Sequence, residues 1–418
     1  MKVIEELESD VRLYSRLWPT VFTKAQGSFI LGEDGRSYLD FFAGAGALNY
    51  GHNNKYLKKA LIEYLNDDGI IHSLDMATSA KIGFLSAFND CILAPRSLDY
   101  KVQFTGPTGA NAVEAALKIA RKISKRSTVV CFTNAFHGMS LGALAVSGSE
   151  HKRAAAGIPL SQTIRIPYDG FSPAADGLEL LDAMLRDGGC GLDRPGAVIV
   201  ETVQGEGGVK AARPAWLRSL AALCAEHGLL LIVDDIQAGC GRTGGFFSFE
   251  EAGLAPDIVC LSKSISGYGL PMAIVLLRPE LDQWNPGEHS GTFRGNNLAF
   301  VAATAAITRY WHDGALEAGT HRHAAQVTAA LAGIAGSHPA GLIAHQGRGL
   351  IHGLAFSRPH LASAVSRRAF ELGLLVETSG PRGEVVKLLP PLTISAESLS
   401  AGLDILAQAV KETADRAD

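Results

Sequence analysis

The stretch LLLIVDDIQ, residues 229–237, places five consecutive apolar residues directly before two aspartates. A short, continuously apolar run of this kind is typical of a strand that is covered on both faces of its sheet. Similar runs occur at residues 101–104 (KVQF), 128–132 (TVVCF), 197–200 (AVIV), 258–261 (IVCL) and 272–277 (MAIVLL). Longer amphipathic stretches such as 111–125 and 215–227 separate several of these runs and predict helices. The alternation predicts an α/β fold with a mostly parallel central sheet and right-handed crossovers.

Both ends of the chain have a different pattern. The N-terminal part combines a helix with a hairpin-like stretch at residues 28–39, and after about Ala315 helices alternate with short strands. These C-terminal strands are expected at residues 350–356, 374–378 and 385–389. We therefore expect a large domain over residues 61–314 and a smaller α+β domain that combines residues 1–60 with residues 315–418.

Composition excludes several classes of protein. The 418 residues suffice for a large core and two or three domains. The net charge of −4 is spread without a dense block of one sign, which argues against a nucleic-acid or anionic-membrane surface. We expect a cytoplasmic protein, because the sequence has no secretory h-region and no apolar stretch of membrane-spanning length. The six scattered cysteines predict free thiols, and no metal is expected because the histidines lack the spacing of metal ligands.

In an open α/β sheet, ligands bind beyond the carboxyl ends of the strands. After residues 101–104 a glycine turn leads through Gly109 and Ala110 into a helix, and a helix N-terminus suits a phosphate group. After residues 128–132 comes Phe136, whose ring could stack on a planar ligand. Taken singly these signals are weak, because such turns are common and most phenylalanines belong to the core.

Charged residues follow the next three strands. Glu201 and Glu206 lie in a Gly-rich loop, where carboxylates are costly unless they are paired or exposed. Asp234 follows five apolar residues and is expected either to be paired or to face a cationic ligand atom. Lys263 follows residues 258–261 among small residues, and burial there would lower the pKa of its amine and make it a nucleophile. Most lysines are exposed, so this residue alone would be a weak signal.

These groups occur in order at successive strand ends, and together they are a stronger signal than any of them alone. Pyridoxal 5′-phosphate needs a phosphate-binding turn, a stacking ring, an acid that keeps the pyridine nitrogen protonated and a lysine that bonds to its aldehyde. The sequence therefore predicts a pyridoxal-phosphate enzyme in which Lys263 carries the cofactor.

Over nearly its whole length the chain resembles the class III (ω-amino) aminotransferases of fold type I. The most specific stretch is LIVDDIQAGCGRTG, residues 231–244, which is similar to the family pattern DE-x-Q-x-G-x-GRTG. The resemblance implies that Lys263 and Asp234 are catalytic, that Asp234 pairs with the pyridine nitrogen, and that Gln237 approaches the ring hydroxyl. It implies a cofactor site made of Gly109, Ala110, Phe136, His137, Asp234, Gln237, Lys263 and Thr292.

Thr292 lies in a segment, HSGT at residues 289–292, that resembles the family segment whose threonine binds the phosphate of the neighbouring subunit's cofactor. The resemblance therefore implies a homodimer, or a higher homo-oligomer, with shared active sites. Glu201 and Glu206 match the acids of the family pattern E-P-x-Q-G-E-x-G and are expected near the substrate.

Two positions depart from the family. Asp235 replaces the usual glutamate, and Lys387 stands where many relatives carry an arginine. In those relatives the arginine pairs with the acid that matches Glu206 and is released to bind the α-carboxylate of glutamate. Lysine lacks the bidentate fork of arginine, so Lys387 either binds substrate differently or is an exposed edge residue.

Several stretches resemble the branch of the family that acts in ectoine biosynthesis, namely residues 40–53, 72–78, 106–109, 261–270 and 287–298. That resemblance implies amino transfer between L-glutamate and L-aspartate 4-semialdehyde, which gives L-2,4-diaminobutyrate and 2-oxoglutarate. The alternatives are a related ω-aminotransferase with another aldehyde acceptor and a pyridoxal-phosphate aminomutase. A cofactor-binding regulator would need a DNA-binding module, for which no basic helical segment is found. A dinucleotide-binding module would need G-x-G-x-x-G after residues 101–104, which is missing.

Overall fold

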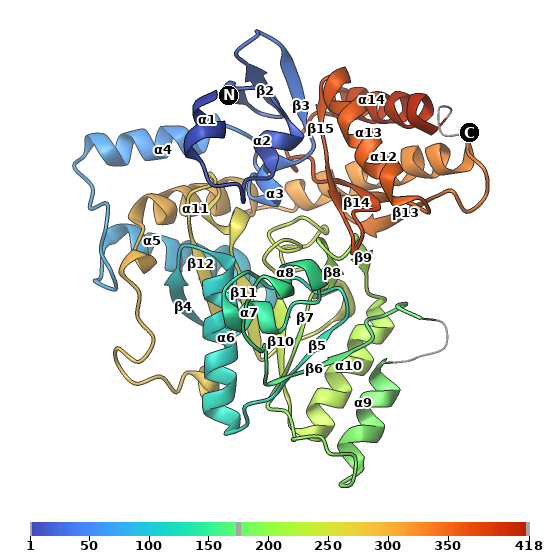
Figure 1. Cartoon of the computed structure of the whole chain (residues 1–418). Coiled ribbons are helices and arrows are strands. Elements are labelled where there is room, and N and C mark those ends of the chain that lie inside the picture. The colour runs from blue at the N-terminus through green and yellow to red at the C-terminus, as the bar shows by residue number, and fades with distance from the viewer. Residues whose placement is uncertain (1, 173–176, 415–418) are drawn as a thin grey trace.

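The computed structural model describes residues 2–172 and 177–414. Its largest sheet has seven strands in the order β4-β12-β11-β10-β7-β5-β6 (Figure 1). In chain order the strands are β4 (Lys101–Gly106), β5 (Val129–Phe132), β6 (Thr163–Ile166), β7 (Ala197–Val200), β10 (Leu230–Asp234), β11 (Ile258–Leu261) and β12 (Ala273–Leu277). Strand β12 is antiparallel to both of its neighbours, β11 and β4. The pairs among β11, β10, β7, β5 and β6 are parallel. The predicted α/β fold with a mostly parallel sheet is confirmed.

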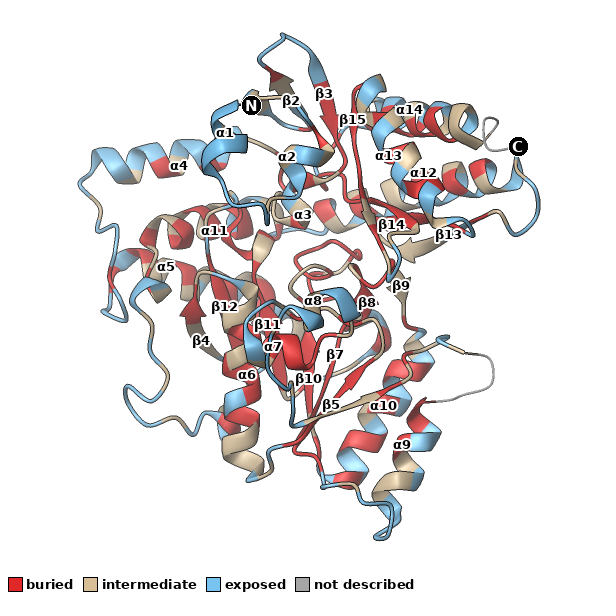
Figure 2. Ribbon diagram, viewed as in Figure 1, coloured by how far each residue is buried: buried red, intermediate tan, exposed pale blue. Residues whose placement is uncertain are grey.

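Helices bury both faces of this sheet, as the continuously apolar strands require (Figure 2). Alternate strand residues point to opposite sides, so Val198 and Val200 join one hydrophobic cluster while Ala197 and Ile199 join another. The first cluster includes Trp216 of α10 and the second includes Val113 of α6. The covering helices are α5 (Ser79–Phe88), α6 (Gly109–Ser124), α7 (Leu141–Ala145), α9 (Gly177–Arg186), α10 (Pro214–His227) and α11 (Asn297–Tyr310).

Three details differ from the sequence-based expectation. Helix α6 begins at Gly109, two residues before the predicted start. Strand β10 includes Asp234 as its last residue, so the acid is held by the sheet itself. The edge strand β6 was not predicted, because its sequence TIRI carries Arg165 and is only partly buried.

Two smaller sheets are built from strands in the N-terminal and C-terminal parts of the chain. One has the order β1-β2-β3-β15 and the other β13-β14-β17-β16. Their strands are β1 (Phe22–Gln26), β2 (Phe29–Gly32), β3 (Ser37–Asp40), β13 (Ile343–Arg348), β14 (Ile351–Phe356), β15 (Leu374–Leu375), β16 (Glu377–Ser379) and β17 (Val385–Leu388). The single strand expected at residues 374–378 is wrong, because the chain leaves one sheet after β15 and enters the other at β16.

Segments from both ends lie side by side at the top of Figure 1, because β15 pairs in parallel with β3. The remaining elements are α1 (Lys2–Leu7), α2 (Tyr14–Leu17), α3 (Ala43–Gly46), α4 (Lys55–Asn66), α8 (Glu150–Ala154), β8 (Val203–Gln204), β9 (Lys210–Ala211), α12 (Ala315–Gly336), α13 (Pro359–Leu372) and α14 (Ala396–Ala414). Among the described residues no helix is long and apolar enough to span a bilayer. The domain boundaries near residues 60 and 314 stay a prediction.

Candidate active site

A cavity of about 170 Å³ lies beyond the carboxyl ends of the central strands. Every predicted site residue except Thr292 and Lys387 lines this cavity. Its walls consist of Gly109, Ala110, Phe136, His137, Gly138, Glu201, Val203, Glu206, Asp234, Ile236, Gln237, Ala238 and Lys263. Residues from five separate segments of the chain are therefore brought together around one cavity.

Lys263 lies two residues after the end of β11 and begins a 3₁₀ turn, Lys263–Ser266. Its φ of 52° lies in the left-handed region, a costly conformation for a residue with a Cβ that is seen mostly where function requires it. The ammonium donates a hydrogen bond of 2.9 Å to the carbonyl oxygen of Ala45. Burial lowers the pKa of the amine to about 8, although the negative charge of Glu206 opposes the shift. A substantial share of the amine is therefore uncharged and nucleophilic near pH 8.

Asp234 stands at the end of β10 and is almost fully buried. One carboxylate oxygen lies 2.7 Å from Nδ1 of His137, and the other accepts from the backbone N–H of Ile236 at 3.2 Å. Burial would lower the pKa of His137, but the hydrogen bond and charge of Asp234 outweigh burial and raise it. Nε2 of His137 is buried without a hydrogen-bond partner. The carboxylate is thus held in place at the cavity wall through both of its oxygens.

The N-terminus of α6 opens onto the same cavity through Gly109 and Ala110. The first N–H groups of a helix have no acceptor within the helix, and its dipole places positive charge there. A Cβ on Gly109 would lie 2.9 Å from Cδ1 of Ile236, so a larger residue there would have to displace the end of that side chain. This end of the cavity is suited to an anion such as a phosphate.

Phe136 forms another wall, and its backbone N–H donates to Oε2 of Glu201 at 3.0 Å. Nζ of Lys152 lies 4.0 Å from the centroid of the Phe136 ring. Burial raises the pKa of Glu201 to about 8, so this carboxyl group is largely protonated at neutral pH. Glu201, which also lines the cavity, therefore supports the backbone of Phe136.

Lys387 of β17 does not line the cavity but contacts Glu206, which does. Its Nζ lies 2.5 Å from Oε1 of Glu206 and 3.0 Å from Oε1 of Glu377, and its side chain is 0% exposed. The hydroxyl of Tyr14 donates to Oε2 of Glu377 at 3.1 Å. We call these four residues the Lys387 cluster. The alternative that Lys387 is an exposed edge residue is wrong.

Charge within the Lys387 cluster is strongly coupled. Burial raises the pKa of Glu206, but the positive charge of Lys387 outweighs burial and lowers it to about 2. Burial raises the pKa of Glu377 despite the same positive charge. Burial would lower the pKa of Lys387, but the two carboxylates raise it above its ordinary value. The cluster thus holds a permanent cation next to the cavity.

Sequence reasoning missed Glu377, Tyr14 and the carbonyl of Ala45. The oxygen of Ala45 accepts from Lys263 and, at 3.0 Å, from Nε2 of Gln237. Glu377 pairs directly with Lys387 in the antiparallel register of β16 and β17. The turn residues at 380–383, GPRG, were the available signal for that hairpin.

Thr292 lies apart from the cavity within the single chain. It begins a 3₁₀ turn, Thr292–Arg294, and its side chain is exposed. Its carbonyl oxygen is 2.7 Å from Nε2 of His72. Within one subunit the structure therefore does not bring Thr292 together with Lys263.

The cavity residues fit pyridoxal phosphate. The α6 N-terminus suits the phosphate, the buried carboxylate of Asp234 suits a protonated ring nitrogen, and the nucleophilic Lys263 amine suits the aldehyde. Gly138 leaves the wall open beside Ala110, because a Cβ there would come within 2.8 Å of that residue's own Cβ. The phosphate, ring and aldehyde would each find a suitable group in the same cavity.

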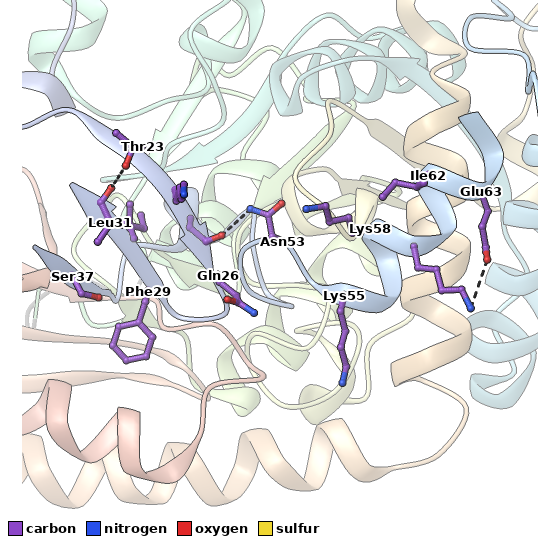
Figure 3. A pocket seen from close by; sticks show the side chains of 14 residues that line it. Thr23, Gln26, Phe29, Leu31, Ser37, Asn53, Lys55, Lys58, Ile62 and Glu63 are labelled. Carbon is purple, nitrogen blue, oxygen red and sulfur yellow. Dashed lines mark hydrogen bonds and ion pairs between the residues drawn. The ribbon is translucent and has the colours of Figure 1, made fainter. Parts of the chain in front are cut away.

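A larger hollow of about 990 Å³ lies elsewhere, between the β1–β3 sheet and α4 (Figure 3). Its walls carry Lys24, Lys55, Lys58 and Lys59, and Lys59 pairs with Glu63 across one turn of the helix. It shares no residue with the cavity around Lys263 and lacks a buried nucleophile. The larger hollow is therefore not the candidate active site, despite its greater volume.

Comparison with known proteins identifies the family. The family model "Aminotransferase class-III" matches residues 14–410, and the chain belongs to this family. A diaminobutyrate–2-oxoglutarate transaminase of Nocardia farcinica is 61% identical over 98% of this chain and 93% of its own length. A protein of the same name from Streptomyces anulatus is 60% identical over 99% of this chain and 98% of its own length. The ornithine aminotransferase of Toxoplasma gondii, a structure with partial occupancy of pyridoxal phosphate at its active site, superposes with a TM-score of 0.86 at 26% identity, covering 99% of this chain and 94% of that one.

Proposed function

We propose that this class III aminotransferase uses pyridoxal 5′-phosphate to transfer an amino group between L-glutamate and L-aspartate 4-semialdehyde, giving L-2,4-diaminobutyrate and 2-oxoglutarate. The chemical part of this proposal rests on the nucleophilic amine of Lys263, which lines the same cavity as the carboxylate of Asp234. The choice of substrates is supported by relatives about 60% identical that bear the name diaminobutyrate–2-oxoglutarate transaminase.

The roles of the cavity residues follow from their chemistry. Gly109 and Ala110 hold the phosphate with backbone N–H groups, and Phe136 covers one face of the ring. Asp234, positioned by His137, keeps the ring nitrogen protonated. Gln237 approaches the ring hydroxyl.

When bound, the cofactor supplies a protonated ring that accepts the electron pair left on the substrate carbon as its proton departs. Lys263 would hold the cofactor through Nζ, and the free amine would be the base that removes the proton from the substrate carbon bearing the amino group. The carbonyl of Ala45 keeps Nζ within the cavity.

Glu206 and Lys387 accommodate two substrates of different charge. The reacting carbon of glutamate bears a carboxylate, whereas that of diaminobutyrate does not. With glutamate, the carboxylate displaces Glu206 from Lys387; with diaminobutyrate, the Glu206–Lys387 pair stays closed. Glu201 supports the wall at Phe136 rather than contacting charge, because its raised pKa keeps it neutral.

We also propose a homodimer with shared active sites. Thr292 is exposed. Exposed apolar side chains lie either next to it in the sequence or in the segment around His72, which contacts the carbonyl oxygen of Thr292. These side chains are Ile70, Ile71, Leu74, Met76 and Phe293. Several exposed apolar side chains near Thr292 favour burial against a partner, and a second copy would bring its own cavity to Thr292.

The cytoplasm remains our prediction for its location, in agreement with six free cysteines, which persist in a reducing compartment. We further infer that the product enters ectoine biosynthesis, as in the branch that the sequence resembles.

A half-reaction assay tests the function. Purified holoenzyme mixed with glutamate alone should release one 2-oxoglutarate for each active site and leave an aminated cofactor that aspartate 4-semialdehyde converts back. An aminomutase would release no 2-oxoglutarate, and a panel of other aldehydes would reveal a different acceptor. Lys263→Ala should abolish turnover; normal turnover in that variant would reject the proposed role of Lys263.

A further inference from the structure

Lys387 is shared by two carboxylates that belong to different parts of the fold. Glu377 lies opposite it on the neighbouring strand, in register, while Glu206 comes from the loop between β8 and β9. Only Glu206 of the two lines the cofactor cavity. The ammonium of Lys387 thus contacts one acid that lines the cavity and one that does not.

The two acids differ in how firmly they are held. The side chain of Glu377 is 5% exposed, sits on a strand and accepts the hydroxyl of Tyr14 on its second oxygen. Tyr14 in turn packs against Phe42 at a centroid distance of 4.8 Å. Glu206 is 25% exposed and is flanked by Gly205, Gly207 and Gly208. The side chain of Glu206 therefore borders the open space of the cavity, whereas that of Glu377 is enclosed by protein.

This difference matters when a substrate carboxylate takes the place of Glu206. A fully buried ammonium that lost its only partner would be an unpaired charge, one of the most costly arrangements in a protein. With Glu377 present, Lys387 keeps one carboxylate throughout the exchange. Its flexible four-carbon stem also stays in position instead of having to be ordered by the substrate.

We propose that Glu377, held by Tyr14, is a fixed anchor for Lys387 that lets Glu206 yield to the carboxylate on the reacting carbon of a dicarboxylic amino donor. Glu377 is a positioning residue, because it acts through Lys387 and does not line the cavity. The inference rests on the proposed function, in which dicarboxylic and monocarboxylic substrates alternate. It explains how a lysine can serve where a longer, forked arginine is usual in the family.

Binding of two unreactive acids to the holoenzyme tests the anchor. Glutarate carries the carboxylate that would displace Glu206, and butyrate is the matching acid without it. Isothermal titration should give a glutarate Kd about tenfold weaker in Glu377→Ala than in wild type, the loss expected for one hydrogen bond to a charged group. Butyrate affinity should change little. Glu377→Gln keeps one amide oxygen that can accept from Lys387, while its NH2 group can donate to the Tyr14 hydroxyl, so it should restore part of the glutarate binding.

Glu384→Ala is the matched control, because it removes a partly exposed carboxylate from the same hairpin and should leave both affinities unchanged. Unchanged or tighter glutarate binding in Glu377→Ala would overturn the anchor, as would a glutamine variant that binds as weakly as the alanine variant. If Glu377→Ala does not fold, Tyr14→Phe decides, with weaker glutarate binding expected and wild-type binding contradicting the proposal.

A second readout separates positioning from general damage. In the glutamate half-reaction, Glu377→Ala should raise KM while leaving kcat nearly unchanged, and the diaminobutyrate half-reaction should keep both values. Equal losses with both substrates would overturn the anchor. Failure of the wild-type protein to release 2-oxoglutarate from glutamate would instead reject the proposed function, whereas the glutarate titration judges Glu377 on its own.

Discussion

Replacing Lys387 with methionine should destabilise the protein strongly and in a pH-dependent manner. The substitution keeps most of the side-chain volume but removes a fully buried cation from between Glu206 and Glu377. Oxygens of both acids lie within 3.0 Å of the same nitrogen, so the variant buries two facing carboxylates without a counter-charge. Removing one partner of a buried ion pair costs about 3–5 kcal/mol.

The sign of the pH effect follows from the same geometry. In wild type, Lys387 keeps the pKa of Glu206 at about 2, so Glu206 is ionised from mildly acidic pH upward. Without the cation, repulsion and burial raise the carboxyl pKa values, and the folded variant holds a proton that the unfolded chain releases. The stability of Lys387→Met relative to wild type should therefore fall as the pH rises from 5.5 to 8.

Urea denaturation at a fixed protein concentration measures this difference. Lys411→Met, at an exposed position, is the matched control and should unfold like wild type at both pH values. Adding Glu206→Gln to Lys387→Met should recover part of the loss, because one of the two opposed charges is gone. A Lys387→Met variant that loses less than about 1 kcal/mol, with no dependence on pH, would refute the reasoning about a buried pair.

Three further predictions concern the cavity and the subunit contact. Burial lowers the pKa of Lys263 to about 8, so the rate at which cofactor-free protein binds pyridoxal phosphate should rise from pH 6.5 to pH 8 and then level off. A stopped-flow rate without this rise would contradict Lys263 as the nucleophile. Burial raises the pKa of Glu201 from 4.5 to about 8, so the folded protein keeps a proton that the unfolded chain loses between these values, and wild-type stability falls as the pH rises through that window. Glu201→Gln cannot ionise, so its melting temperature relative to wild type should increase by about 2 °C or more between pH 5 and pH 8.5, and a constant difference would argue against a neutral Glu201. Thr292→Ala should leave a dimer that sediments like wild type but loses cofactor on dialysis about tenfold more readily, as one missing phosphate hydrogen bond would cause; a monomeric wild-type protein would exclude the shared site.

The central part of the fold was predictable because runs of neighbouring residues in the sequence determine its strands and helices. Five apolar residues before Asp234 indicate a strand buried on both faces, and helices on either side follow from that burial. The same logic located Gly109, Phe136 and Lys263 at strand ends, where the topology gathers them in one cavity.

The rest depended on contacts that sequence periodicity does not encode. Residues 374–379 form one short run, LLVETS, with no glycine or proline to mark a break, so nothing local reveals that β15 and β16 belong to different sheets. The pairing of Glu377 with Lys387 requires the exact hairpin register, and the contact with Tyr14 joins residues 363 positions apart. Thr292 lies outside the cavity of its own chain, and its expected contact with the cofactor of a second subunit stays a prediction.

The covalent bond at Lys263 is the central claim, and reduction followed by peptide mapping tests it most directly. Borohydride makes a bond between a lysine amine and the cofactor permanent, so digestion and mass spectrometry identify the lysine that carries it. We predict a single modified peptide that contains Lys263. Modification at another lysine, or at none in protein that retains the cofactor's absorbance, would contradict the account.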